Sequence, residues 1–399
     1  MQEVVIVSAK RTAIGSFMGS LKGVKASELA TNVVKAIFDD IGIGGGGATL
    51  SPSIIDELIL GQILQSAQGQ NPARQVLINS GIDKEKIAFT INDLCGSGLK
   101  AVELGYLNIA LGEKDFILAG GAENMSASPF LLENIRDGYK MGEQKIYDSM
   151  IKDALTDAFE NIHMGITAEN LAKKYNISRK EQDEFALHSQ QKATKALQSG
   201  VFKDEIVPIT LKSKKGDKVF EVDEFVKTDI SMESLSKLRP AFLKDGTVTA
   251  GNASGINDAA AMLLLTSKKK AKELNLPILA KIKAIASVGC EPNIMGIGAA
   301  EATKAVLKKA KMTLKDIDII EANEAFAAQS IACIKELDAD ASKINVNGGA
   351  IALGHPVGAS GARIVVTLLH EMKRKNHKLG LATLCIGGGQ GIAAIFEKE

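Results

Sequence analysis

The chain of 399 residues contains no tryptophan, only 4% aromatic residues and four cysteines. Four cysteines are too few for a disulfide scaffold in a chain of this length. Because no Cys-x-x-Cys pair occurs, we expect no structural zinc site either. With so few aromatic residues, aliphatic and small side chains must fill the core. The 38 glycines and the 45% of hydrophobic residues favour closely packed α/β layers.

An excess of either charge and long apolar runs are also missing. Lys and Arg number 48 against 47 Asp and Glu, so the chain lacks the basic excess that nucleic acids or membrane surfaces attract. Apolar runs such as 259–265 are far shorter than the roughly 18 residues that span a bilayer. The N-terminus enters a strand-like run at 4–8 without a targeting leader. We therefore expect a soluble, cytoplasmic protein with free thiols and neither nucleic acid nor membrane as a partner.

Short aliphatic stretches alternate with longer amphipathic segments along most of the chain. A helix is predicted over 98–111, where Leu99, Val102 and Ile109 share one face. Residues from about 126 to 246 are more polar. The alternation predicts α/β layers around buried sheets, with the polar segment inserted into the first half. Strands are predicted at 4–8, 57–61, 87–91, 116–120, 262–266, 278–287, 317–322, 379–385 and 391–396.

One glycine pattern imitates a nucleotide site. Gly42, Gly44 and Gly47 satisfy the spacing G-x-G-x-x-G. That motif requires a strand before it and a helix after it, whereas these glycines follow a helical stretch at 29–38. We interpret them as a surface loop.

Cys95 lies in the segment NDLCGSGLKA at 92–101, between a predicted strand and a predicted helix. A helix N-terminus offers unpaired N–H groups and a dipole that stabilise a thiolate. A lone cysteine is more often an inert buried residue, but this position favours a nucleophile. The small residues Gly96 and Gly98 would let a substrate approach closely.

His355 and Cys385 both lie in glycine-rich segments. Five glycines within residues 348–361 remove side-chain bulk around His355, and Pro356 stiffens the turn. Cys385 ends a predicted strand and runs into the turn IGGGQG, whose N–H groups could hold an oxyanion. Asn323 follows another strand end, where it could orient water or an imidazole or could cap a helix. Two thiols, one histidine and glycine-rich loops suggest acyl transfer. The chain lacks a G-x-S-x-G elbow, a Walker A loop and a cluster of metal ligands, so we expect no metal.

Together these segments closely resemble the thiolase family over essentially the whole chain. The motifs are NDLCGSGLKA at 92–101, GNASGIND at 251–258, NEAF at 323–326, GGAIALGHPVGASG at 348–361 and CIGGGQG at 385–391. The resemblance implies a five-layered α-β-α-β-α fold of two similar βαβαβαββ halves with an inserted loop domain. It places the N-terminal half at 1–125, completed by about 257–277, the coenzyme A-binding loop domain at 126–256 and the C-terminal half at 278–399. It also implies a homodimer or a homotetramer built as a dimer of dimers.

The resemblance assigns catalytic roles residue by residue. Cys95 matches the nucleophile that becomes acylated, and His355 matches the imidazole that takes its proton. Cys385 matches the acid/base that moves the proton at the α-carbon of the second acyl-CoA. Asn323 matches the residue that fixes a water, and that water and His355 would hold the oxygen of the enolate. The backbone N–H groups of Cys95 and Gly387 would hold the acyl-enzyme carbonyl oxygen.

The resemblance also implies acetyl-CoA, acetoacetyl-CoA and CoA as substrates and products, with no tightly bound cofactor. The segment that begins at His163, and Met164 in particular, resembles that of the biosynthetic, short-chain members of the family. We therefore expect two acetyl-CoA molecules to condense to acetoacetyl-CoA. Lys227 replaces an arginine that often contacts the nucleotide, and the segment after Met295 lacks a usual proline. The expected coenzyme A contacts are His163, Met164, Leu155, Lys227, Ser234, Phe242, Ala250, Gly251, Ser254, Met295, Ala325 and Phe326.

Three alternatives stay open at this point. The first is a 3-ketoacyl-CoA thiolase of broad chain length. The second is a decarboxylating condensing enzyme, a class that lacks a cysteine at the second strand turn, so that Cys385 counts against it. The third is a catalytically inactive acyl-CoA-binding or scaffold protein, which the complete set Cys95, His355, Cys385 and Asn323 disfavours.

Overall fold

The computed structural model describes residues 1–44, 50–214 and 216–399. Paired strands follow one continuous path, β13-β14-β15-β12-β1-β11-β5-β3-β4. The first half supplies β1 (Val4–Thr12), β3 (Glu57–Gly61), β4 (Ile87–Ile91), β5 (Phe116–Asn124) and β11 (Asn257–Ser267). The second half supplies β12 (Ala280–Gly289), β13 (Ile319–Ala322), β14 (Leu379–Ile386) and β15 (Gln390–Glu397). The two sheets join where β1 and β12 pair over Val5 and Ile6.

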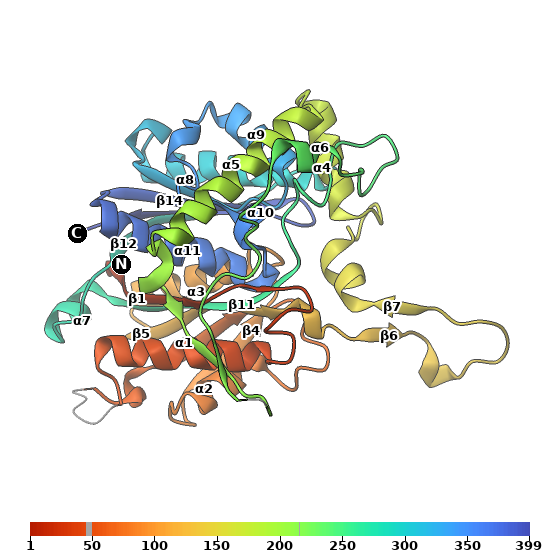
Figure 1. The fold of residues 1–399 in the computed structure, drawn as a ribbon. Coiled ribbons are helices and arrows are strands. Elements are labelled where there is room, and N and C mark those ends of the chain that lie inside the picture. Colours follow the sequence, from red (N-terminus) through yellow and green to blue (C-terminus); the bar gives the residue numbers. More distant parts are fainter. Residues whose placement is uncertain (45–49, 215) are drawn as a thin grey trace.

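Helices arrange the two sheets into five layers (Figure 1). Helices α1 (Ala26–Ile41) and α2 (Pro72–Asn79) cover the outer face of the first sheet through one apolar cluster. Helices α3 (Ser97–Leu111) and α11 (Val357–Lys375) lie between the sheets and share a core with both. Helix α8 (Gly298–Ala310), with α9 (Ala327–Leu337) beside it, covers the outer face of the second sheet. The expected α-β-α-β-α order is confirmed.

The two halves follow the same order of elements with one exception. The first half runs β1-α1-β3-α2-β4-α3-β5-β11, as expected. In the second half the strand that would correspond to β4 is reduced to a single bridge between Ile320 and Ile344. The expected βαβαβαββ pattern is therefore complete only in the first half. Each predicted strand of the α/β halves coincides with an observed one, although β11 begins five residues before its predicted start at 262.

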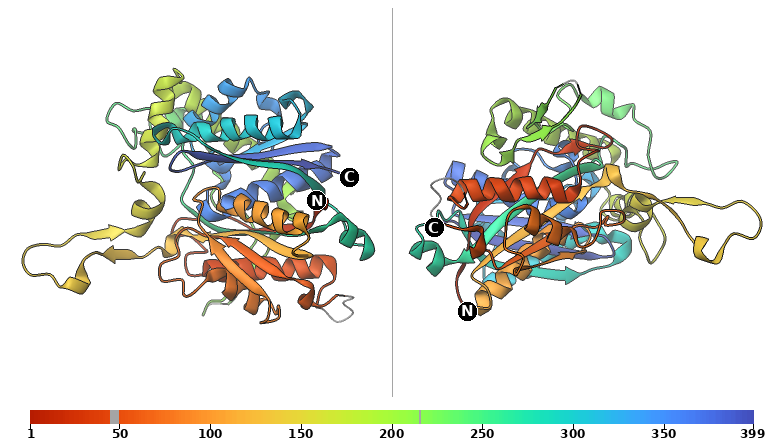
Figure 2. Two further views of the ribbon diagram at one scale, coloured as in Figure 1. Left: turned by 180° about the vertical axis from the view of Figure 1, so that it is seen from behind. Right: turned by 90° about the horizontal axis from the view of Figure 1, so that it is seen from below.

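The polar segment 126–256 lies along one side of the layers. It begins with a hairpin of β6 (Phe130–Leu132) and β7 (Ile146–Asp148) that projects away from the body (Figure 2). A π-helix at Ile151–Leu155 follows, and then come α4 (Met164–Lys174), α5 (Arg179–Gln198) and α6 (Met232–Ser236). Strand β8 (Ile206–Val207) returns to pair with β1 in parallel, so the segment contributes to the first sheet.

Two sequence expectations concern absent features. Gly42 ends α1 with a φ of 74°, so no strand precedes the glycine-rich stretch, while Gly47 lies outside the described residues. Across the described ranges, no helix is both long enough and apolar enough to cross a membrane.

Candidate active site

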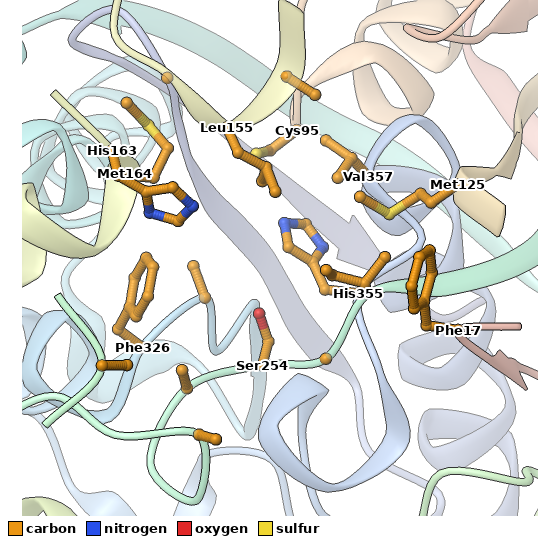
Figure 3. A pocket seen from close by; sticks show the side chains of 18 of the residues that line it. Phe17, Cys95, Met125, Leu155, His163, Met164, Ser254, Phe326, His355 and Val357 are labelled. Carbon is orange, nitrogen blue, oxygen red and sulfur yellow. The ribbon is translucent and has the colours of Figure 1, made fainter. Parts of the chain in front are cut away.

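A cavity of about 450 Å³ opens where the starts of α3 and α11 meet the loops of segment 126–256. Cys95 and His355 both line it, and their side chains face into it (Figure 3). Gly387 lines the same cavity from the turn after β14. Most of the remaining wall is apolar, which suits an uncharged chain such as the arm of a thioester carrier.

Cys95 occupies the turn between β4 and α3, two residues before the helix begins. The preceding residue, Leu94, has a φ of 45°, a strained conformation for a bulky side chain. Burial raises the pKa of the Cys95 thiol to about 11, although the N–H groups of Gly387 and of Cys95 itself point at the sulfur and lower it. Backbone N–H groups thus favour the thiolate of Cys95, as expected for a helix N-terminus, but desolvation of the buried sulfur has the larger effect on its pKa. The thiol needs a base.

His355 is that candidate base. Its Nδ1 lies 2.6 Å from Ser360 Oγ, and that hydroxyl is 3.0 Å from the Pro356 carbonyl oxygen. If Ser360 donates to Pro356, it accepts from Nδ1–H, which leaves Nε2 without a proton. Burial, helped by the charge of Arg363, lowers the pKa of His355 to about 4, so the ring is neutral near pH 7. Its backbone N–H donates to Asn257 Oδ1 over 2.9 Å, which fixes the turn.

Asn323 follows β13 and is 1% exposed. Its backbone N–H donates to the Thr383 carbonyl, and its Nδ2 lies 3.5 Å from His355 Nδ1. Its Oδ1 has no hydrogen-bond partner among the residues that the structure describes. Helix α9 begins at Ala327, so Asn323 does not cap it. An unpaired buried oxygen beside the imidazole is suited to hold a water.

Cys385 is the penultimate residue of β14 and is fully buried in a cluster with Met164 and Phe326 of the cavity wall. Burial raises the pKa of this thiol well above its ordinary value, and the proximity of Cys95 adds to the effect. The turn after it contains Gly388 and Gly389, with φ values of 78° and 84°. A Cβ on Gly389 would lie 2.3 Å from the Cys290 carbonyl oxygen, so the turn requires glycine there.

Most of the expected coenzyme A contacts line the cavity: Leu155, His163, Met164, Lys227, Phe242, Ala250, Ser254, Met295, Ala325 and Phe326. Two do not. Ser234 is exposed and forms a capping box with Ser231 at the start of α6. Gly251 packs under the same helix, where a Cβ would meet the side chains of Leu235 and Leu238. The structure thus places Ser234 within α6 and Gly251 against it, and neither residue lines the cavity.

His163 and Lys227 illustrate the two kinds of side chain on the wall. His163 caps α4, accepting from Gly165 N–H over 3.0 Å, and its ring stacks on Phe242 at 4.6 Å. Burial lowers the pKa of His163, which favours a neutral ring. Lys227 is exposed, and its ammonium lies 5.6 Å from the ring centroid of Phe225. Lys227 is therefore a solvated cation at the edge of an apolar cavity.

Sequence reasoning missed the other residues of the wall. Leu94 and Val357 adjoin residues that were predicted, so their neighbours could have indicated them. Of the rest, three lie within the motif at 251–258, next to the predicted Ser254, and the others come from segments in which the sequence shows no chemical motif. Together, these remaining residues are Phe17, Met125, Ile151, Ala154, Phe225, Ala241, Thr249, Ala253, Gly255 and Ile256.

Comparison with known proteins identifies the family. Residues 4–269 match the family profile described as Thiolase, N-terminal domain, and residues 276–398 match Thiolase, C-terminal domain. These two matches together span nearly the whole chain. They correspond to the two stacked α/β halves, with Cys95, Cys385 and His355 lying where the halves meet. The chain belongs to the thiolase family of acyltransferases.

Individual relatives are similar over their full length. An acetyl-CoA acetyltransferase of Chromobacterium violaceum is 55% identical, covering 99% of this chain and all of the relative. The crystal structure of the Bacillus anthracis acetyl-CoA acetyltransferase has a TM-score of 0.96 and 45% identity, covering 100% of this chain and 99% of that one. Human mitochondrial 3-ketoacyl-CoA thiolase in complex with CoA has a TM-score of 0.94 and 44% identity, covering 100% and 98%.

Proposed function

We propose that the protein is an acetyl-CoA C-acetyltransferase. It condenses two acetyl-CoA molecules to acetoacetyl-CoA and CoA, reversibly, through an acetyl-cysteine intermediate. The observation that carries the proposal is the meeting of a thiol, Cys95, and a neutral imidazole, His355, in one apolar cavity with Cys385 directly behind it. The names of the similar enzymes of Chromobacterium violaceum and Bacillus anthracis support it.

The first half-reaction acylates Cys95. His355 Nε2 takes the thiol proton, and the sulfur attacks the thioester carbonyl. The N–H groups of Cys95 and Gly387, which point at the Cys95 sulfur, are placed to hold the oxyanion that forms. The carbon–sulfur bond to coenzyme A then breaks, and Cys385 gives its proton to the leaving CoA thiolate. The result is acetyl-Cys95, a Cys385 thiolate and a protonated His355.

The second half-reaction makes the carbon–carbon bond. The Cys385 thiolate removes a proton from the methyl carbon of a second acetyl-CoA, which regains for Cys385 the proton it lost. Protonated His355, and a water held by the free Oδ1 of Asn323, stabilise the enolate oxygen. The enolate carbon attacks acetyl-Cys95, the Cys95 sulfur leaves, and His355 returns the proton to it. All groups are restored.

Substrate binding uses the rest of the cavity wall. The pantetheine arm of coenzyme A would lie along apolar residues such as Phe242 and Phe326, close to Ser254. Lys227, at the exposed edge, would attract a phosphate of the nucleotide, although an ammonium forms fewer fixed hydrogen bonds than the guanidinium of arginine. No tightly bound cofactor and no metal are needed for these steps.

The acyl chain length separates this proposal from its closest alternative, a 3-ketoacyl-CoA thiolase of broad chain length. The similarity to the human mitochondrial 3-ketoacyl-CoA thiolase keeps that alternative in view. Met164 is 7% exposed and lines the cavity, where its side chain would limit the space for the acyl group. We expect thiolysis of the C4 3-ketoacyl-CoA to be faster than that of the C10 substrate. Faster turnover of the C10 substrate would favour the alternative.

The assembly, the location and the domain limits belong to the same proposal. We propose a homodimer or a homotetramer, because β4 ends the strand path with Ile87 and Phe89 exposed and because Met141 in the projecting hairpin is 92% exposed. We also propose that segment 126–256 acts as the coenzyme A-binding loop domain. A cytoplasmic location would keep the two thiols reduced. Light scattering of the purified protein tests the assembly.

A further inference from the structure

The two halves place four chemically capable residues at corresponding positions. Cys95 lies two residues before α3, and His355 lies two residues before α11. In the first sheet Gly61, at the end of β3, pairs with Gly121; in the second, Ala322, at the end of β13, pairs with Thr383. The residue two positions further along is Cys385 in the second half and Glu123 in the first. The mechanism uses three of these four positions and leaves Glu123 unused.

Glu123 is fully buried, and within the described ranges its carboxylate accepts hydrogen bonds only from backbone N–H groups. Its Oε2 accepts from Gly358 over 2.9 Å and from Ile63 over 3.1 Å, and its Oε1 accepts from Leu64 over 3.1 Å. Among the described residues no cation forms an ion pair with it. A Cβ on Gly358 would lie 2.6 Å from Oε2, so only glycine permits this approach.

These bonds join the two halves beside the reacting groups. Gly358 stands in the first turn of α11, three residues after His355, where backbone N–H groups have no partner within the helix. Ile63 and Leu64 follow β3 in the first half and pack against Met125 and Val357 beside Cys95. One carboxylate therefore ties the helix start that carries His355 to the half that carries Cys95.

We propose that Glu123 is a positioning residue that holds the start of α11, and with it His355, in place against Cys95. Glutamine could not replace it, because both carboxylate oxygens accept from N–H groups and an amide would turn a donor toward one of them. The inference rests on the proposed acylation of Cys95 for its kinetic readout but not for its structural one.

The ionisation of Glu123 predicts how the rate of Cys95 acylation depends on pH. Burial raises the pKa of Glu123 to about 7, against the lowering effect of the three N–H groups, and Asp258 on β11 raises it further. Cys95 also interacts electrostatically with Glu123, which raises the pKa of that thiol. Above pH 7 the carboxylate accepts all three bonds; below it, the added proton opposes an N–H donor. Acylation should therefore weaken as the pH falls through about 7, although His355 itself protonates only near pH 4.

The test compares Glu123→Gln with a matched control, Glu57→Gln. Glu57 is also buried and accepts a hydrogen bond from Asn108 over 2.9 Å. It is the first residue of β3, whereas Ile63 and Leu64, which bond Glu123, follow the last residue of that strand. We would measure acetylation of Cys95 by acetyl-CoA from pH 5 to 9 by quenched mass spectrometry. We expect Glu123→Gln to slow acetylation about 10- to 100-fold at pH 8 with little change in KM, and to lose the acid limb near pH 7. Glu123→Asp should lie between, and Glu57→Gln should match the wild type.

Hydrogen–deuterium exchange supplies the readout that does not depend on the reaction. Glu123→Gln should speed exchange of the peptide covering residues 355–361, and Glu57→Gln should not. A Glu123→Gln protein with wild-type exchange there and an unchanged acid limb would overturn the proposal. So would a variant that only melts earlier while its folded fraction reacts at the wild-type rate. If instead the wild type takes no acetyl group while exchange responds as expected, the proposed function fails and the positioning role stands.

Discussion

At the scale of single residues, the two proposed reacting groups, Cys95 and His355, are both neutral near pH 7, and their buried surroundings explain why. Burial raises the pKa of Cys95 to about 11 and lowers that of His355 to about 4, so neither group is charged near pH 7. In the proposed mechanism, the ionic form is favoured only where a substrate brings a developing oxyanion to the N–H groups of Cys95 and Gly387. The proposed mechanism therefore couples proton transfer to substrate binding.

The two thiols should differ in what their removal abolishes. Cys95→Ala removes the nucleophile, so we expect no acetyl-enzyme and a loss of turnover of at least about 1,000-fold. Cys385→Ala leaves the nucleophile in place, so acetyl-Cys95 should form and persist while condensation stops. Intact and peptide mass spectrometry after incubation with acetyl-CoA distinguishes the two. An acetyl group on another residue of the wild type would contradict the assignment of Cys95.

The pH dependence of alkylation tests the raised pKa of Cys95 in the free protein. Because only the thiolate reacts, and its fraction rises about tenfold per pH unit below the pKa, alkylation of Cys95 by iodoacetamide should keep rising from pH 7 to pH 10. The Cys95→Ala variant gives the background from the other thiols. A plateau below pH 8 would mean that the helix N-terminus stabilises the thiolate after all.

The element that sets the site geometry is the crossing of α3 and α11. A Cβ on Gly98 would lie 2.6 Å from the backbone nitrogen of Ala362, and one on Gly361 would lie 2.5 Å from that of Leu99. Glycine on both helices thus lets the two backbones meet close to the helix starts that present Cys95 and His355.

An added methyl group at this crossing should force the helices apart. We expect Gly361→Ala to destabilise the protein by about 1–3 kcal/mol and to lower kcat, since the distance between thiol and imidazole changes. Gly23→Ala is the control, because nothing lies within 4 Å of its Cβ position. Chemical unfolding and initial rates measure both effects. Equal stability of the two variants would show that the crossing adapts.

The elements themselves were largely predictable, whereas the cavity was not. Aliphatic runs such as 116–120 and the face of Leu99 and Val102 predict strand and helix because burial imposes a period on the sequence. The sequence also predicted that Cys95, His355 and Cys385 lie near the ends of helices or strands. The loop residues of the wall carry no such period, and the pKa of Cys95 depends on burial that only the assembled halves create. The reduced strand at Ile344 also left no clear signal.

At the scale of the whole molecule, a buried charge cluster attaches segment 126–256 to the first half. Arg11 on β1 is fully buried and bonds Glu205 over 2.6 Å and Asp223 over 2.7 Å. Burial opposes its charge, but the two carboxylates outweigh that effect and raise its pKa. The segment that supplies much of the cavity wall is thereby held to the sheet.

Removal of this cation should loosen that attachment. We expect Arg11→Met to lower the free energy of unfolding by about 3–5 kcal/mol, because two carboxylates are left buried without their partner. Lys237→Met is the matched control, since Lys237 pairs with Glu233 at an exposed surface and should change stability by less than about 1 kcal/mol. Thermal melting compares them. A small effect at Arg11 would mean that water replaces the guanidinium.

The place of β15 in the sheet has a consequence for how the enzyme is made. Residues 390–397 form a strand that lies between β12 and β14, so a late stretch of sequence occupies the interior of the second sheet. During synthesis the first half can fold early, but Cys385 and Gly387 have no framework until this strand has left the ribosome and inserted. Activity should therefore appear only once residues 390–397 are free to insert, and a nascent chain that stops before residue 390 should be inactive.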